Sequence, residues 1–185
     1  MKTKDMIIIA LFAALTSILS LLPAIPLPLS PVPITFQVLG VFLTGSILGS
    51  KKGAIAMVLY LILGALGLPV YAGAQGGLSV LLGPTGGYLL GFPVAAFICG
   101  YFVERSEENQ HKKTSAFVLS AILGIAAIYL LGTLQLAYVL KLEIGKAFLV
   151  GSLPYIPLDI VKMLMAFALA QPVRSRLKAS RLITK

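Results

Sequence analysis

Long apolar stretches, interrupted by short charged segments or by runs rich in proline and glycine, dominate the chain. A helix needs about 20 mainly apolar residues to cross a bilayer, so this pattern predicts an all-α, polytopic membrane protein. Charged residues precede the first stretch and no small-residue cleavage site follows it, so we expect a retained span rather than a signal peptide. The pattern predicts a single domain, 1–185, with a bundle of six transmembrane helices: 6–22, 34–48, 53–66, 86–103, 114–139 and 154–171.

Composition agrees with this class of protein. Of the 185 residues, 58% are hydrophobic and only 11% are charged, which is more apolar than a soluble domain of this size requires. The formal net charge is +9, but the basic residues cluster in short loops and near the C-terminus. That distribution favours orientation in the bilayer and contact with anionic lipid, and it argues against nucleic acid as a partner.

The positions of lysine and arginine predict the orientation of the spans. If the N-terminus is cytoplasmic, the outer side carries only Lys141 and Lys146, and Lys162 lies inside the membrane. The positive-inside rule therefore predicts that both termini face the cytoplasm. The basic residues that this orientation places on the inner side are Lys2, Lys4, Lys51, Lys52, Arg105, Lys112, Lys113, Arg174, Arg176, Lys178, Arg181 and Lys185.

Asp159 and Lys162 are the candidate functional pair, because both lie within the last predicted span. Placing a lone Asp or Lys at the centre of a membrane helix costs about 2.5–3.5 kcal/mol. Residues three positions apart share a helix face, so the two charges can partly neutralise each other. The pair predicts a buried polar site that recognises a ligand. The alternative is a proton relay in a self-sufficient carrier or an intramembrane enzyme.

Two segments on the predicted outer side are unusual and predict structured loops. Loop one, 23–33, has five prolines in eleven residues, and loop three, 67–85, is rich in glycine and nearly free of charge. Apolar, non-helical backbone near a membrane is tolerated where it is buried in protein or lines a cavity. We therefore expect both loops to form the walls or lid of one outward-facing pocket around Asp159 and Lys162.

Several residues near these loops are candidates for the pocket. Loop three offers an amide and a hydroxyl among glycines that let a ligand approach the backbone. The start of the fourth span offers free backbone amides, with helix packing as the alternative role of its glycines. The tyrosines near the outer boundary either contact ligand or anchor the interface, as Tyr138 is expected to do. The candidate residues are Tyr71, Gly73, Gln75, Ser79, Gly86, Tyr88 and Tyr155.

Ala10 and Ala14 put two small residues on one face of the first span. Such a pair either packs inside the protein or forms a groove where another membrane helix docks, and the residues alone favour internal packing. The sequence has few features typical of an enzyme. The only histidine, His111, lies in a charged loop, and no metal-ligand cluster or phosphate loop is present. We therefore expect neither catalysis nor a cofactor.

The segment 67–92 closely resembles the BioY family, the biotin-specific substrate-binding components of energy-coupling factor (ECF) transporters, and the resemblance extends over essentially the whole chain. It implies capture of biotin outside a prokaryotic cell membrane, with a transmembrane coupling protein and two ATPase subunits as partners that alone bind ATP. Ala10 and Ala14 match the family's Ala-x-x-x-Ala docking pattern, which raises the docking hypothesis above internal packing.

The resemblance also implies roles for the charged pair, without fixing which atom each side chain contacts. Asp159 would accept a hydrogen bond from an N–H of the biotin ureido ring, and Lys162 would donate to its carbonyl or brace Asp159. The biotin carboxylate would take amides of loop three or of the fourth span, or would face water. The chain departs from the family at Tyr71, where phenylalanine is frequent, at Leu158, where glycine is frequent, and at the variable position of Gln75.

Overall fold

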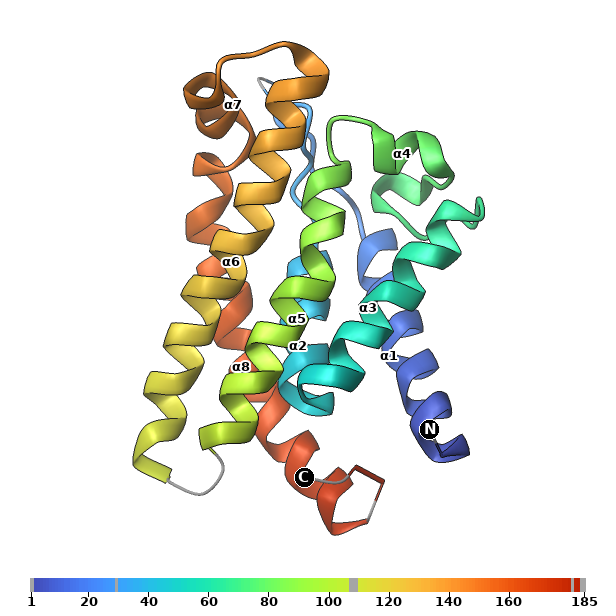
Figure 1. The fold of residues 1–185 in the computed structure, drawn as a ribbon, viewed down its shortest axis with the longest axis vertical. Coiled ribbons are helices and arrows are strands. Elements are labelled where there is room, and N and C mark those ends of the chain that lie inside the picture. Colours follow the sequence, from blue (N-terminus) through green and yellow to red (C-terminus); the bar gives the residue numbers. More distant parts are fainter. Residues whose placement is uncertain (1, 29, 107–109, 181, 184–185) are drawn as a thin grey trace.

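The computed structural model of the chain describes residues 2–28, 30–106, 110–180 and 182–183, and for 110–113 only the backbone (Figure 1). Within these residues the regular structure is helical, and β pairing is confined to two isolated bridges, Ile25–Ile34 and Tyr71–Gln75. The elements are α1 (Thr3–Leu21), α2 (Gln37–Leu48), α3 (Ser50–Ala65), η1 (Ala72–Ala74), α4 (Leu78–Leu82), α5 (Gly86–Ser106), α6 (Gln110–Leu140), α7 (Ile144–Gly151), η2 (Leu153–Tyr155) and α8 (Ile156–Ala179).

Four segments are long and apolar enough to cross a membrane: Thr3–Leu21, Gly86–Ser106, Thr114–Leu140 and Ile144–Ala179. This confirms the prediction of an all-helical, multi-pass membrane protein. The second and third predicted spans correspond to α2 and α3, which have only 12 and 16 residues. Because both are short, the count of six spans stays a prediction.

The helices differ from the predicted spans mainly at their ends. Helix α8 continues eight residues beyond the predicted end at 171, through Pro172, to Ala179. The predicted loops contain two short helices, α4 and α7, that the apolar pattern did not indicate. His111 belongs to the backbone of α6 rather than to a loop, and its side chain lies outside the described residues.

The connections gather at two opposite ends of the bundle (Figure 1). At one end, the terminal end, lie the N-terminus, the turn between α2 and α3, the end of α5, the start of α6 and the end of α8. At the other end, the loop end, lie loop one, α4 and α7. This grouping is the one that the predicted topology requires. Arg181 and Lys185, and the side chains of Lys112 and Lys113, lie outside the described residues.

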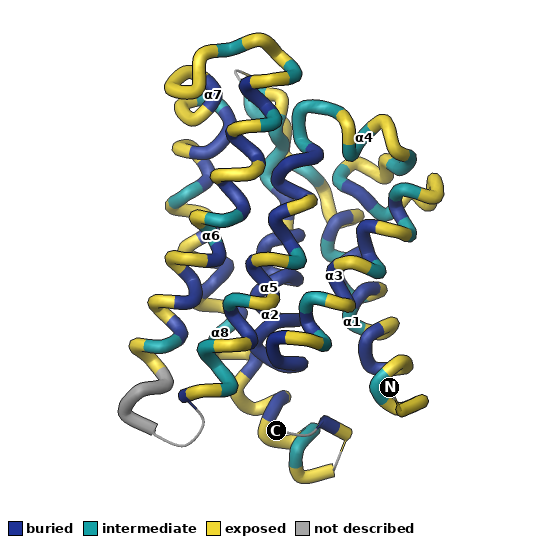
Figure 2. Tube along the Cα trace, in the orientation of Figure 1, coloured by how far each residue is buried: buried dark blue, intermediate teal, exposed yellow. Residues whose placement is uncertain are grey.

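Helix α2 is the core of the bundle, because every one of its 12 residues is buried (Figure 2). A helix that is apolar all round is stable only when other elements surround it, and α8, α5, α3 and α1 all contact α2. The outer faces of the long helices are instead apolar and exposed, as at Leu130 and Leu164. Such faces are typical of helices that contact lipid.

Glycines bring α5 and α6 close together. A side chain at Gly91 would lie 2.7 Å from the Cα atom of Ile128, and one at Gly87 would meet the carbonyl of Leu131. The glycines of the fourth span therefore pack against the fifth span, which is the alternative role that the sequence offered for them. This contact fixes α5 and α6 as one wall of the loop end.

Two charged side chains hold the turn between α2 and α3 at the terminal end. Gly49 joins the helices with a φ of +86°, a conformation that favours glycine. Arg174 donates to the carbonyl of Ile47 at 2.5 Å, and Glu104 accepts from the amide of Ser50 at 3.0 Å. A cation therefore lies at the C-terminus of α2 and an anion at the N-terminus of α3, which is the favourable arrangement for both helix dipoles.

Candidate functional site

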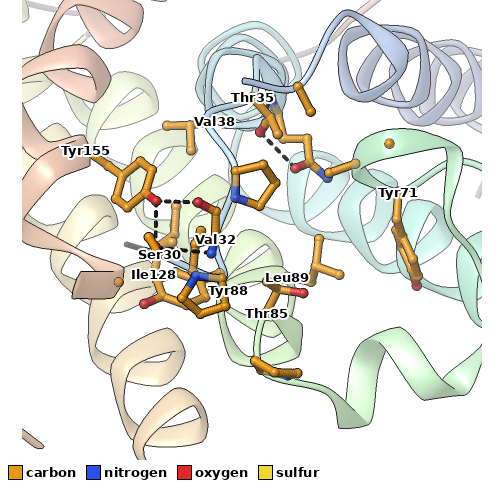
Figure 3. A pocket seen from close by; sticks show the side chains of 18 of the residues that line it. Ser30, Val32, Thr35, Val38, Tyr71, Thr85, Tyr88, Leu89, Ile128 and Tyr155 are labelled. Carbon is orange, nitrogen blue, oxygen red and sulfur yellow. Dashed lines mark hydrogen bonds between the residues drawn. The ribbon is translucent and has the colours of Figure 1, made fainter. Parts of the chain in front are cut away.

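A cavity of about 460 Å³ opens at the loop end, between loop one, loop three, α2, α5, α6 and α8 (Figure 3). This volume is in the range of pockets that bind small molecules. Its walls are mainly apolar, as at Val38, Leu89 and Ile128, and a few polar groups point into it. Both loops contribute to the walls, as the sequence predicted.

Asp159 and Lys162 lie in the first two turns of α8 and line the cavity. Their side chains form an ion pair of 2.7 Å between Nζ and Oδ1, and Asp159 and Lys162 are only 3% and 8% exposed. The three-residue spacing thus gives the contact that the sequence predicted. Because of their burial, each charge depends on the other for compensation.

Tyr129 is a member of this cluster that sequence reasoning missed. Its hydroxyl donates to Oδ2 of Asp159 at 2.7 Å, so each carboxylate oxygen accepts one hydrogen bond from the protein. Tyr129 is buried in the middle of α6 and also lines the cavity. In the sequence, the only indication of this role is a tyrosine in the middle of an apolar span, far from both ends of that span.

Loop one forms a roof over the cavity. An antiparallel bridge closes its stem, where the amides of Ile25 and Ile34 each donate to the other's carbonyl at 3.0 and 2.9 Å. Near its tip, the hydroxyl of Tyr155 lies 2.8 Å from Oγ of Ser30 and donates to the carbonyl of Val32 (Figure 3). Tyr155 therefore ties the proline-rich loop to the start of α8, one turn before Asp159.

Loop three supplies another wall through Tyr71, Gly73 and Gln75. The amide of Tyr71 donates to the carbonyl of Gln75 at 2.9 Å, and Gly73 turns the chain between them with a φ of +68°. The Tyr71 hydroxyl donates to the carbonyl of Leu61 in α3 at 2.6 Å, and burial raises its pKa to about 12. That hydroxyl is therefore occupied within the protein, whereas the exposed side chain of Gln75 remains near the mouth.

Tyr88 supports the cluster from α5. Its ring meets the ring of Tyr129 edge to face, with centroids 6.4 Å apart and an interplanar angle of 76°. Its hydroxyl lies 3.4 Å from Oγ of Ser152, which also lies 2.8 Å from Oγ1 of Thr133. Tyr88 thus lines the cavity and fixes the position of Tyr129 through ring packing.

Thr35 and Gln37, at the start of α2, line the opposite wall and were not predicted. Thr35 donates to Oε1 of Gln37 at 2.8 Å, and Nε2 of Gln37 donates to the hydroxyl of Tyr60 at 2.7 Å. The signal that sequence reasoning passed over was the presence of two polar residues beside the start of an otherwise apolar span.

Ser79 and Gly86 do not line the cavity, in contrast to the prediction. Ser79 is exposed in α4. The amide of Gly86 donates to the carbonyl of Gly83 at 3.2 Å, so the expected free amide is taken up by a turn. A side chain at Gly86 would meet the carbonyl of Leu81, which makes close packing the role of this glycine. The remaining candidates, Tyr71, Gly73, Gln75, Tyr88, Tyr155, Asp159 and Lys162, all line the cavity.

Ala10 and Ala14 are both exposed on α1, so the hypothesis of internal packing is wrong for this pair. Ala10 lies in an apolar groove between α1 and α3, together with Ile7, Ile55 and Ile62. The two alanines leave a shallow surface on which a second helix backbone can approach closely.

Comparison with known proteins agrees over nearly the whole chain. The model of the BioY family matches residues 1–179. The chain is similar to a biotin transporter BioY of Rhizobium etli, with 44% identity over 177 residues that cover 94% of each protein. It is also similar to a biotin transporter BioY of Thermotoga maritima, with 42% identity over 146 residues that cover 79% of this chain and 83% of the relative.

A solved structure has the same fold. The crystal structure of the S-component for biotin from an ECF-type ABC transporter matches with a TM-score of 0.85 and covers 95% of each chain at 27% identity. The chain therefore has the fold of an S-component of an ECF-type transporter.

Proposed function

The chain belongs to the BioY family, and from that premise we propose that it captures biotin with high affinity at the outer face of the membrane. It is a transport protein and not an enzyme, in agreement with its relatives and with the absence of catalytic motifs from the sequence. Its role is that of the substrate-binding subunit of an ATP-driven ECF uptake transporter in a prokaryotic cell membrane.

The observation that carries this proposal is the buried Asp159–Lys162 pair in a cavity of ligand size. The ureido ring of biotin has two N–H donors and one carbonyl acceptor. The Asp159 carboxylate accepts from an N–H, and Lys162, which has three N–H donors and uses one on Asp159, donates to the carbonyl. The thioether ring and aliphatic chain of biotin suit the apolar walls at Val38, Leu89 and Ile128.

The carboxylate of biotin then points toward the mouth of the cavity. Among the residues that the structure describes around the cavity, Lys162 is the only cation, and it is paired with Asp159. The other polar groups on offer are neutral, such as Gln75 and the backbone of loop three. We therefore assign the ureido ring to the charged pair and the tail to loop three.

In this proposal the chain itself supplies no energy for transport. It spans the membrane six times with both termini in the cytoplasm, binds no cofactor, and leaves ATP to two ATPase subunits of the transporter. A transmembrane coupling protein docks on the α1 face that carries Ala10 and Ala14, where exposed small residues allow close approach.

Purified chain and reconstituted transporter together test this function. Native mass spectrometry of the chain in detergent is expected to show one biotin per chain, and uptake into proteoliposomes is expected only when the coupling protein and ATPases are added with ATP. Biotin uptake by the chain alone, driven by a proton gradient, would instead show the self-sufficient carrier.

The docking surface has its own test, since a bulky side chain at Ala10 and Ala14 blocks close helix approach. The double variant Ala10→Leu/Ala14→Leu is expected to keep full biotin affinity and to lose ATP-driven uptake. Ala126→Leu is a matched control, because Ala126 is exposed on α6, away from α1. Normal uptake by the double variant would overturn the assignment of this surface.

A further inference from the structure

We propose that Tyr129 is a positioning residue for ligand recognition, which holds the Asp159 carboxylate in the one orientation that accepts hydrogen bonds from a cyclic urea. This inference rests on the proposed function, because it concerns how the same cavity distinguishes its ligand. It adds a residue from the middle of α6 to a site whose charged members both lie on α8.

The two hydrogen bonds to Asp159 come from different directions. Lys162 lies one turn further along the same helix and donates to Oδ1, whereas Tyr129 reaches across from α6 and donates to Oδ2. Each bond is 2.7 Å long. Tyr129 is thus the contact that fixes the carboxylate relative to a second element, which Lys162 cannot do from α8.

The remaining hydrogen-bonding capacity of Asp159 is therefore defined. An ionised carboxylate has about four acceptor positions, two on each oxygen. One position on each oxygen is used within the protein, so about one on each is left for a ligand. Rotation of a carboxyl group about χ2 has a broad, shallow preference, and donors on both oxygens suppress it.

The ring of Tyr129 is itself fixed by its neighbours. It packs edge to face against Tyr88, and both residues are buried, with 7% of each residue exposed. The hydroxyl therefore reaches Asp159 from a rigid aromatic side chain with two rotatable bonds. A flexible donor such as a lysine would hold the carboxylate far less firmly, because it loses more conformational entropy on being fixed.

The central test compares the biotin affinity of Tyr129→Phe with that of wild type. The ring and its packing remain in this variant, and only the hydrogen bond to a charged group is removed. We expect Kd for biotin to rise roughly tenfold to a hundredfold. Ser120→Ala is the matched control: Ser120 lies on the same helix, its buried hydroxyl donates to the carbonyl of Phe117 at 2.7 Å, and it does not line the cavity. Its Kd is expected to stay within about twofold of wild type, the ordinary scatter of a neutral change.

A double-mutant cycle separates positioning from general damage. If Tyr129 acts through Asp159, adding Tyr129→Phe to Asp159→Asn changes Kd far less than it does alone, because residues in direct contact are non-additive. The Tm of ligand-free protein is expected to fall by a similar amount in Tyr129→Phe and Ser120→Ala, since each loses one buried hydroxyl.

Three outcomes overturn the proposal: an unchanged Kd in Tyr129→Phe, an equal rise of Kd in Ser120→Ala, or an additive effect in the cycle. Failure of the proposed function is recognisable separately, because wild-type chain would then show no saturable binding of biotin. N-methylation of biotin at a ureido nitrogen gives a further comparison, in which the effect of Tyr129→Phe is expected to shrink because one ligand donor is missing.

Discussion

Within the residues that the structure describes, two Asp–Lys ion pairs have nearly equal lengths and very different surroundings. Asp5 and Lys52 are 2.5 Å apart and join α1 to α3 at the terminal end, with side chains about one fifth exposed. Asp159 and Lys162 are 2.7 Å apart at the loop end, with side chains only 5% and 10% exposed. The first pair ties two helices together near water, whereas the second lines a cavity and receives a third donor from Tyr129.

The comparison teaches that distance alone does not make a binding site. An exposed pair contributes little to stability because water solvates each ion nearly as well as its partner does. A buried pair has lost that solvation, so each ion depends on its protein partners and on any ligand that brings further hydrogen bonds. What distinguishes the second pair is unused hydrogen-bonding capacity facing an enclosed space.

The largest expected effect follows from removing one member of the buried pair. Asp159→Ala leaves the Lys162 ammonium without its carboxylate, and breaking a buried pair in this way costs about 3–5 kcal/mol. Thermal unfolding of ligand-free protein in detergent is expected to show a fall in Tm of several degrees, and addition of biotin is expected to restore little of it. A Tm equal to that of wild type would mean that the pair is solvated.

Removing the cation should weaken both the ligand-free protein and its binding of biotin. Lys162→Met keeps an apolar stem of similar length and leaves Asp159 with the donor of Tyr129. Loss of a hydrogen bond from a charged group predicts a rise in Kd for biotin of roughly tenfold to a hundredfold, measured by calorimetric titration. An unchanged Kd would show that Lys162 contributes nothing beyond neutralising its neighbour.

Weakening the attachment of loop one, the roof over the cavity, is expected to have a smaller effect, on the dissociation rate of biotin. Tyr155→Phe removes the hydroxyl that contacts Ser30 and Val32, so loop one opens more readily. A neutral hydrogen bond contributes about 0.5–1.5 kcal/mol, which predicts a dissociation rate of biotin about 2- to 12-fold faster in stopped-flow experiments. Tyr138→Phe serves as the control, because Tyr138 is 85% exposed; an equal rate in both variants would exclude Tyr155 as the tie.

The smallest effect is expected at the other ion pair. Asp5→Asn removes a partly exposed salt bridge at the opposite end of the bundle from the cavity. We expect an unchanged Kd for biotin and a slight fall in Tm that vanishes at high salt, where such pairs are screened. A marked loss of biotin affinity in this variant would show that biotin binding does not distinguish the two pairs.

The sequence predicted those parts of the site that have a local signature. Asp159 and Lys162 stand out because charge inside an apolar span is costly, and their spacing alone puts them on one helix face. Loops one and three stand out because closely spaced prolines exclude a regular helix and clustered glycines destabilise one. Each of these signals depends only on residues that are close together along the chain.

Other features depend on contacts between distant segments, which no local pattern encodes. The bond from Tyr129 to Asp159 requires a particular register between α6 and α8, and the bond from Tyr155 to Ser30 joins residues 125 positions apart. The exposure of Ala10 and the burial of the Gly86 amide likewise depend on which neighbours the fold supplies. The short helices α4 and α7 were missed because they lie within segments dominated by turn-forming or mixed residues.

The central claim, that the buried pair recognises the ureido ring of biotin, is tested most directly by titrating biotin into two purified variants in parallel. Asp159→Asn and Asp5→Asn each replace one carboxylate of an Asp–Lys pair by an amide of the same shape. One biotin per chain with wild-type affinity in Asp5→Asn, and a loss of at least tenfold in Asp159→Asn, is the predicted result. Full biotin affinity in Asp159→Asn would contradict the claim.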